Sequence, residues 1–290
     1  EYFHQVDDGY SYLAVQALEQ LLARYNVEFK CHLVGPPEGA NSPEPELLME
    51  LSRYDATKIA PYYGLDFPDC AKMPDQCIVD SAKAILSVLS DSDFVLHAKI
   101  IGQALWASDQ PALDKLKAVW GISTDAEISK RYASGNARRA ALKHYSGGMF
   151  YYGGEWYWGV DRLYHLENRL MELGACKDKS ERLLCPRPDI EMGPSQDSGN
   201  LKLRFFVSLR SPYTSIIYKK TKELAEKTGV QLEISPVLPM VMRGVPATME
   251  KGKYIMSDTA REAKTLNIDW GGSVYDPIGK PVNKCYAIYP

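Results

Sequence analysis

The segment Ser211-Pro212-Tyr213-Thr214 opens a stretch that is typical of a helix ending at Gly229. A serine oxygen at the N-cap accepts a hydrogen bond from a first-turn amide, and a proline at the first helical position has no amide to leave unpaired. Gly229 suits the left-handed conformation that closes a helix. The amides and dipole at such an N-terminus favour an anion. Ser211 is therefore a candidate anion contact, although helix capping alone accounts for the same residues.

Cysteine and histidine chemistry has little support in the sequence. The six cysteines contain no C-x-x-C pair, so dithiol exchange has no obvious site, and they are too sparse in 290 residues for a disulfide scaffold. The five histidines show no ligand spacing with one another or with cysteine, so we expect no metal site. These residues are Cys31, Cys70, Cys77, Cys176, Cys185 and Cys285, and His4, His32, His97, His144 and His165.

Length and charge limit the class of protein. A chain of 290 residues is long enough for two domains at about 150 residues each. Its 34 Lys and Arg against 37 Asp and Glu give a net charge of -3, which provides no field to attract nucleic acid or an anionic membrane. No apolar run approaches the roughly 18 to 20 residues of a membrane span, and no secretory signal is visible. We expect a cytoplasmic protein that acts on a small molecule.

The chain contains a weak internal repeat. A shift of 203 positions aligns about seventy residues without a gap, with at least eight identities and the same order of strand, helix, strand and loop in both copies. The agreement of these patterns predicts two copies of one domain. Identical pairs include Tyr10 with Tyr213, Leu21 with Leu224, Val27 with Val230, Val34 with Val237, Pro36 with Pro239, Asp55 with Asp258, Ala60 with Ala263 and Pro74 with Pro277.

Apolar periodicity predicts the elements of each copy. The second copy has a strand at 201–207, the helix after Ser211, a strand at 230–235 and a helix at 254–266. The first copy has a matching β-α-β at 1–35 and then a helical region. Its helices are predicted at 78–89, 94–107, 111–119 and 126–133, and strands at 149–152 and 156–158 flank Gly153-Gly154 before a helix at 160–173.

This order predicts an α/β protein with a thioredoxin-like fold, an α-helical insertion and two tandem copies. The boundaries are 1–175 for the first domain, 176–200 for an aperiodic linker and 201–290 for the N-terminal part of the second. The second copy lacks a counterpart of residues 88–175. We expect its sheet to be completed by further chain, by the first copy or by a partner, so pairing of the copies or a homodimer is anticipated.

Two segments carry a resemblance to a known family. Gly148-Met-Phe-Tyr-Tyr-Gly-Gly-Glu155, continued by Trp158-Gly-Val-Asp-Arg-Leu163, resembles the closing signature of the DSBA-like thioredoxin superfamily, in the branch of 2-hydroxychromene-2-carboxylate isomerase and the kappa-class glutathione transferases. The Ser-Pro-Tyr turn at 211–213 resembles the other end of that signature. The resemblance covers residues 1–175 and the second copy as far as it extends. It implies the fold more specifically than the reaction.

The resemblance implies a role for Ser211 as the catalytic serine before the proline of the first helix. In disulfide-oxidising relatives the turn is C-P-x-C, so Ser211 and Thr214 stand where the cysteines would be, beside Pro212 and Tyr213. A hydroxyl there would stabilise the thiolate of glutathione as cosubstrate, which adds to an unsaturated substrate. The Met242-Arg243 pair follows the second strand, where the family's loop borders the active site. It would line a substrate pocket, or Met242 would fill the core.

The first copy departs from the family pattern. Asp8 stands at the serine position, Gly9 at the proline, and Gly148 at the proline that is usually cis in relatives. An aspartate caps a helix, but its charge would repel a thiolate, so we expect an inactive turn. Asp161-Arg162 matches positions near the glutamyl end of glutathione in relatives, or is only a helix-terminal pair.

Three functions stay open. The first is a glutathione-dependent isomerase or transferase acting at Ser211 on a small unsaturated or aromatic acid. The second is a non-catalytic thioredoxin-like tandem for binding or assembly. The third, a DSBA-like thiol oxidoreductase, is disfavoured because the C-x-x-C pair is absent.

Overall fold

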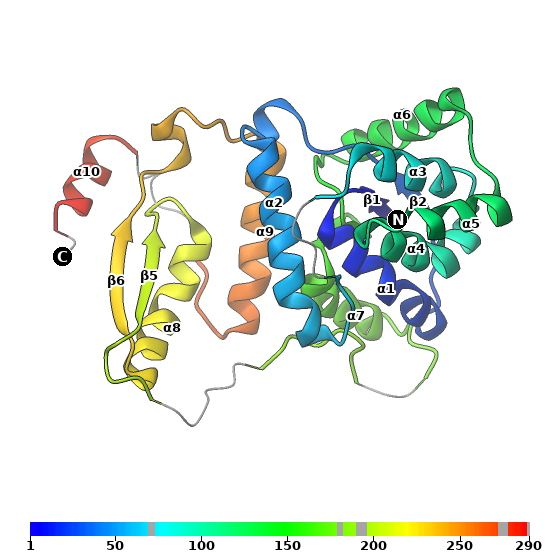
Figure 1. The fold of residues 1–290 in the computed structure, drawn as a ribbon. Helices are drawn as coiled ribbons and strands as arrows, with labels where there is room; N and C mark the ends of the chain where they lie inside the picture. Colours follow the sequence, from blue (N-terminus) through cyan, green and yellow to red (C-terminus); the bar gives the residue numbers. More distant parts are fainter. Residues whose placement is uncertain (69–72, 179–181, 190–195, 272–277, 289–290) are drawn as a thin grey trace. The chain divides into compact units, whose positions relative to one another are not determined.

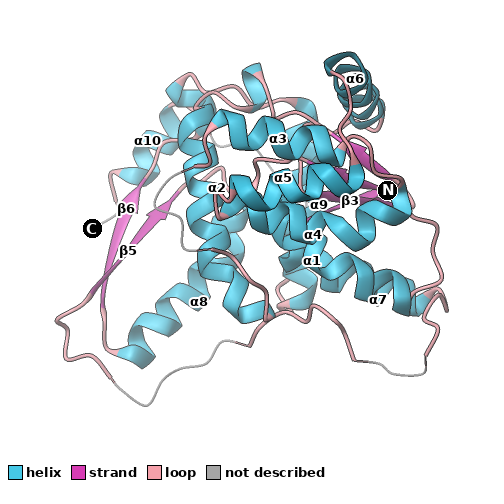
Figure 2. Ribbon diagram, turned by 45° about the vertical axis from the view of Figure 1, so that its right-hand side comes forward, coloured by secondary structure: helices cyan, strands magenta, loops and turns pink. Residues whose placement is uncertain are grey.

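The structure is a computed structural model of the chain, and it describes all residues except 69–72, 179–181, 190–195, 272–277 and 289–290. It divides into two compact units, Glu1–Pro188 and Asp189–Pro290, which we call unit 1 and unit 2. Each unit has its own sheet and helices (Figure 1). Helices make up most of the chain and strands a smaller part (Figure 2).

Unit 1 is built on a four-stranded mixed sheet with the order β2-β1-β3-β4. Strands β1 and β2 are parallel and are joined by α1, whereas β3 is antiparallel to β1 and β4 to β3. Gly153 and Gly154 have φ angles of 53° and 90°, as the two-residue turn between β3 and β4 requires. The elements are β1 (Tyr2–His4), α1 (Gly9–Arg24), β2 (Cys31–Leu33), β3 (Met149–Tyr152) and β4 (Glu155–Trp158).

A helical insertion separates β2 from β3, and α7 follows the hairpin. Along the chain, unit 1 has a β-α-β unit, then several helices, then a β-β-α unit. Together with the strand order, this makes it a mixed α/β structure with a thioredoxin-like sheet and a helical insertion. The further elements are η1 (Gly39–Asn41), α2 (Pro45–Ile59), η2 (Ala60–Tyr63), α3 (Gln76–Leu86), α4 (Asp91–Trp106), α5 (Gln110–Trp120), α6 (Asp125–Ala141), η3 (Val160–Arg162) and α7 (Leu163–Glu172).

Helix α6 continues to Ala141, so its predicted end at Ala133 is wrong. The apolar periodicity stops near that residue, but polar contacts hold the remaining turns. Asn136 Oδ1 accepts a hydrogen bond from Gly35 N at 3.0 Å, and Arg139 Nη1 donates to Gly35 O at 2.9 Å. The half-buried Asn136 and the buried Arg139 thus attach α6 to the chain after β2, a contact that a pattern of apolar residues cannot show.

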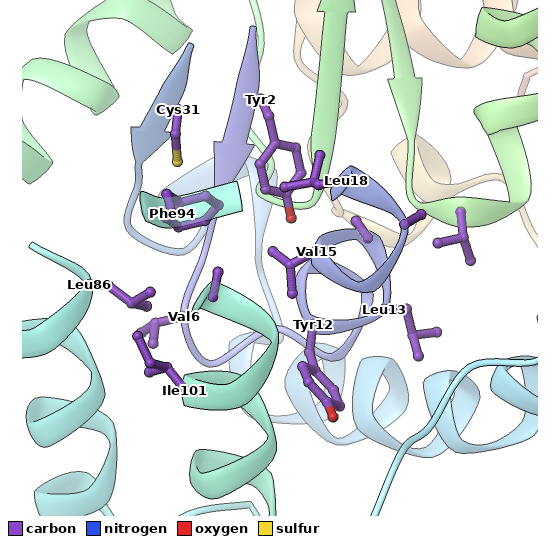
Figure 3. Packing of buried hydrophobic residues seen from close by; sticks show 14 of the residues in the cluster. Tyr2, Val6, Tyr12, Leu13, Val15, Leu18, Cys31, Leu86, Phe94 and Ile101 are labelled. Carbon is purple, nitrogen blue, oxygen red and sulfur yellow. The ribbon is translucent and has the colours of Figure 1, made fainter. Parts of the chain in front are cut away.

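The core of unit 1 lies against α1, which buries most of its length. Figure 3 shows Val15 and Leu18 near Tyr2 of β1, with Phe94 of α4 in the same cluster. Each such side chain, when fully buried, stabilises the fold by roughly 1.5–3 kcal/mol. This packing fixes where α1 begins, and therefore where its N-terminal amides point.

Residues 176–188 group with unit 1, although the sequence predicts them as part of the linker. The buried carboxylate of Glu167 on α7 accepts hydrogen bonds from the amides of Leu184 and Cys185, both at 2.9 Å, and from Tyr25 Oη at 3.0 Å. An aperiodic segment can therefore be held by backbone donors to one buried carboxylate.

Unit 2 contains a parallel pair of strands, β5 and β6, joined by α8. Helix α9 begins at Met249, five positions before the predicted start at Tyr254. The prediction missed this turn because residues 249–253 carry little apolar pattern, whereas the Thr248 hydroxyl caps it by accepting from Lys251 N at 3.3 Å. The elements are β5 (Lys202–Val207), α8 (Pro212–Thr228), β6 (Gln231–Pro236), η4 (Met240–Arg243), α9 (Met249–Thr265) and α10 (Lys280–Tyr286).

Candidate functional site

The candidate site of unit 2 lies at the carboxyl ends of β5 and β6. Because these strands are parallel, the chain after β5, which contains Ser211, and the chain after β6, which contains η4, leave the sheet at the same edge. The phenol of Tyr286 on α10 joins the two segments. It accepts from Leu209 N at 3.1 Å and donates to Val237 O at 2.6 Å. Sequence reasoning missed Tyr286, since nothing local marks a residue 75 positions beyond Ser211.

Ser211 is the N-cap of α8. Its backbone is extended, with φ -92° and ψ 115°, and its hydroxyl oxygen accepts from Thr214 N at 3.3 Å, while Pro212 takes the first helical position. The Ser211 residue is half-buried. A hydroxyl that accepts a bond through its oxygen can still donate its own hydrogen. The arrangement can therefore add one O–H donor to the amides at the start of a 17-residue helix.

Tyr213 and Thr214 have contacts of their own. The phenol of Tyr213 donates to Asp258 Oδ2 at 2.8 Å and so ties the first turn of α8 to α9. The Thr214 hydroxyl oxygen accepts from Ser208 N at 3.4 Å, which steadies the turn before the helix. These two side chains therefore shape the turn that presents Ser211.

Met242 and Arg243 differ in exposure. Met242 is half-buried, and its sulfur accepts from Gly279 N at 3.4 Å, next to the start of α10. Arg243 is exposed at the end of η4. Met242 thus contacts the start of the helix that carries Tyr286, and Arg243 presents its charge to solvent.

The equivalent position in unit 1 is filled by a carboxylate. Asp8 is the N-cap of α1, and its Oδ2 accepts from both the amide and the hydroxyl of Ser11 at 2.8 Å. Its Oδ1 accepts from Ser52 Oγ at 2.6 Å. Burial raises the pKa of Asp8, although these hydrogen bonds act in the opposite direction. The N-terminus of α1 therefore already holds an anion supplied by the chain.

Two glycines, Gly148 and Gly9, lie in closely packed positions near the start of α1. Gly148 has a φ of 66°, and a Cβ added there would lie 3.0 Å from Asp8 Oδ2. A Cβ on Gly9 would lie 2.9 Å from Ala56 Cβ and 3.0 Å from Ser52 O. No cis peptide bond occurs among the residues that the structure describes. Gly148 thus leaves room for the Asp8 carboxylate, whereas Gly9 allows the start of α1 to pack closely against α2.

Asp161 and Arg162 bind each other. Arg162 Nη1 lies 2.8 Å from Asp161 Oδ2 in η3 of unit 1. The Asp161 charge also contributes to the raised pKa of Tyr10, for which burial is the largest cause. These residues belong to the surroundings of Asp8 in unit 1, not to the Ser211 turn of unit 2.

The helix starts of the two units share two hydrogen bonds at equivalent positions. Asp8 and Ser211 each cap through the amide three residues on. Tyr10 Oη donates to Asp55 Oδ2 at 2.7 Å, as Tyr213 Oη does to Asp258 at 2.8 Å. In each case the residues in unit 2 follow those in unit 1 by 203 positions.

Comparison with protein-family models gives no match, and comparison with curated proteins gives none either. A solved structure described as SeMet 2-hydroxychromene-2-carboxylate isomerase (HCCA isomerase) is similar to this chain, with a TM-score of 0.45 and 17% sequence identity. The similarity covers 60% of this chain and 94% of that chain. The thioredoxin-like character of unit 1 rests on the strand order and directions given above.

Two further kinds of site have no support in the described part of the chain. No group of three or more His, Cys, Asp and Glu side chains there is placed to hold a metal ion. No described helix combines the length and apolar character needed to cross a bilayer.

Proposed function

We propose that the chain is a glutathione-dependent isomerase or transferase that acts on a small unsaturated or aromatic acid at Ser211. The observation that carries the proposal is the cap of α8, where a half-buried hydroxyl accepts from Thr214 N and keeps its own hydrogen for a ligand. A thiolate at this place would be favoured by the helix amides, the helix dipole and that hydroxyl.

The reaction follows from this arrangement. The glutathione thiol loses its proton to solvent, and the Ser211 hydroxyl donates to the sulfur. The thiolate then forms an S–C bond with an unsaturated carbon of the acid. As this bond forms, the π electron pair of the double bond moves to the neighbouring carbon. In isomerisation the resulting single bond rotates, the pair re-forms the double bond, and the S–C bond breaks and returns its electrons to sulfur. In transfer the neighbouring carbon takes up a proton from solvent and the S–C bond remains. The exposed Arg243 would attract the carboxylate of the substrate.

We further propose that units 1 and 2 are diverged copies of one domain, with domains at 1–175 and 201–290 joined by 176–200. The shared Tyr–Asp hydrogen bonds and the shared caps, each displaced by 203 positions, support this. In this view only the second copy keeps a cap that leaves room for a thiolate. Pairing of the copies or a homodimer, and a cytoplasmic location, stay predictions.

Calorimetry with glutathione tests the role of Ser211. We expect the wild type to bind, Ser211→Ala to bind more weakly, and Ser211→Asp to lose binding, because aspartate preserves the cap but repels a thiolate. Ser257→Ala, an exposed serine on α9, is the matched control and should bind as the wild type does. The ultraviolet absorbance of the bound thiolate should fall in the same order.

The alternative is a non-catalytic tandem that binds or assembles. Asp8 favours it for unit 1, because the helix N-terminus there is already occupied. Absence of glutathione binding by the wild type at millimolar concentration would overturn the enzymatic proposal and favour this alternative. Equal binding by Ser211→Asp and wild type would show that glutathione binds elsewhere.

A further inference from the structure

Unit 1 contains a cavity of about 310 Å³ beside the start of α1. It is bounded by the chain after β2 and by the first turns of α2, and Trp158 of β4 completes one wall. This volume is at the lower end of the range of about 300–1,000 Å³ for small-molecule sites. The cavity is therefore large enough for a small organic ligand.

The cavity has carboxylates in its lining and no basic side chain among the described residues that line it. Asp8 is buried and receives its hydrogen bonds from neutral donors, the serines 11 and 52. Asp7 is half-buried, and its Oδ1 accepts from Gln5 Nε2 at 3.0 Å, another neutral donor. Neutral donors leave the net negative charge in place.

A third carboxylate, Glu38, is exposed where it contributes to the lining. It lies close enough to Arg139 to act on the pKa of that guanidinium, although burial lowers this pKa to about 10. Arg139 does not line the cavity; its Nη1 donates to Gly35 O. The charge of Glu38 is thus partly balanced by that of Arg139, and the net charge of the cavity depends mainly on Asp7 and Asp8.

Aromatic and aliphatic side chains form the other walls. The rings of Tyr10 and Trp158 lie 5.9 Å apart between centroids at an interplanar angle of 78°. Leu48 and Met49 of α2 add apolar surface. A cation near such rings gains about 0.5–2 kcal/mol from the ring quadrupole, beyond its attraction to a carboxylate.

We propose that this cavity binds a small organic ammonium ion, with the charged nitrogen towards Asp7 and Asp8 and the apolar part against Tyr10 and Trp158. Burial raises the pKa of Asp8, and a cationic ligand beside it would favour the charged form of this carboxyl group. The inference does not depend on the role of Ser211, because every residue that lines the cavity belongs to unit 1.

Two probes of opposite charge and similar shape test the proposal. Calorimetry or ligand-observed NMR would compare 2-phenylethylammonium with 3-phenylpropanoate on the full chain. We expect the ammonium to bind and the carboxylate not to bind. Asp7→Asn should weaken the ammonium about tenfold or more, as for loss of a charged hydrogen-bond partner, and Trp158→Leu should weaken it about 2- to 30-fold.

Glu19→Gln provides the matched control, because it removes the same charge from an exposed position of α1 outside the cavity. It should leave the affinity unchanged. Asp7 is chosen over the buried Asp8 because its replacement should preserve the fold, which circular dichroism would check. The proposal is overturned if the ammonium shows no binding at millimolar concentration, if both probes bind equally, or if Asp7→Asn and Trp158→Leu bind as the wild type does.

Discussion

The N-terminus of α1 in unit 1 and that of α8 in unit 2 follow a strand in the same way but carry different caps. In unit 1 the buried Asp8 carboxylate uses both oxygens to accept from serines. In unit 2 the half-buried Ser211 hydroxyl accepts one amide hydrogen bond. A helix N-terminus favours one anion, so a chain that supplies its own anion removes the place for a thiolate.

The contrast also extends to the residues around the two caps. Gly148 leaves room for the Asp8 carboxylate, since a Cβ there would lie 3.0 Å from Oδ2. A side chain at position 148 would therefore crowd the Asp8 carboxylate. The two units thus differ at the residues around the caps, while their Tyr–Asp hydrogen bonds are alike.

The largest expected difference between the two units is in how acid changes their stability. Burial lowers the pKa of His4 and of His144 to about 3, and the sequence of unit 2 contains no histidine. A lowered folded-state pKa means that the unfolded chain takes up the proton first, so stability present above pH 6.5 is lost as the pH falls towards 3. Between pH 8 and pH 5 each histidine should cost unit 1 about 2 kcal/mol.

Hydrogen exchange, corrected for the intrinsic effect of pH, would follow amides of each unit separately. His144→Asn should reduce the acid-induced loss of stability in unit 1 by about half, because it removes one of the two buried histidines. Its amide oxygen can replace Nδ1 as the acceptor for Ser146 N, so the local hydrogen bond is kept. Equal loss in both units, or an unchanged pH dependence in this variant, would contradict the prediction. Asp8 works in the opposite direction, since its pKa is raised.

Removal of the caps should have a smaller but unequal effect. Asp8→Ala leaves buried serine hydroxyls without their acceptor and should destabilise unit 1 by about 2 kcal/mol, whereas Ser211→Ala should destabilise unit 2 by about 1 kcal/mol. Thr124→Ala, which removes the exposed cap of α6, is the control and should resemble Ser211→Ala. Exchange at neutral pH measures all three. If Asp8→Ala costs no more than Thr124→Ala, the carboxylate is only a cap.

The elements of the fold were predictable where apolar spacing or local capping marks them. The β3–β4 hairpin follows from its double glycine, and the start of α8 from Ser211-Pro212. The last turns of α6 could not be predicted, because Asn136 and Arg139 hold them by hydrogen bonds to Gly35, which is distant in the sequence. Pattern analysis detects the periodic burial of apolar side chains and not polar docking.

The same limit applies to the candidate site. Asp8 was identified from its position before the helix, but its partner Ser52 lies 44 residues away and has no motif. Tyr286 contacts Leu209 across 77 positions and was missed for the same reason. Local capping geometry can be predicted from sequence, whereas partners brought by the fold cannot without the structure.

The smallest expected effect concerns what the two units share. Double-mutant cycles on Tyr10→Phe with Asp55→Ala, and on Tyr213→Phe with Asp258→Ala, should give coupling energies of about 1 kcal/mol that agree within about 0.5 kcal/mol. The cycle is needed because Asp258 also pairs with Arg261 at 3.4 Å, and a single substitution would remove both contacts. If the two coupling energies are similar while the cap substitutions have unequal effects, the units differ at the helix N-terminus and not at the Tyr–Asp contact. A coupling present in unit 1 and absent in unit 2 would instead mean that the second unit has lost the contact fixing its first turn, and with it the geometry proposed for Ser211.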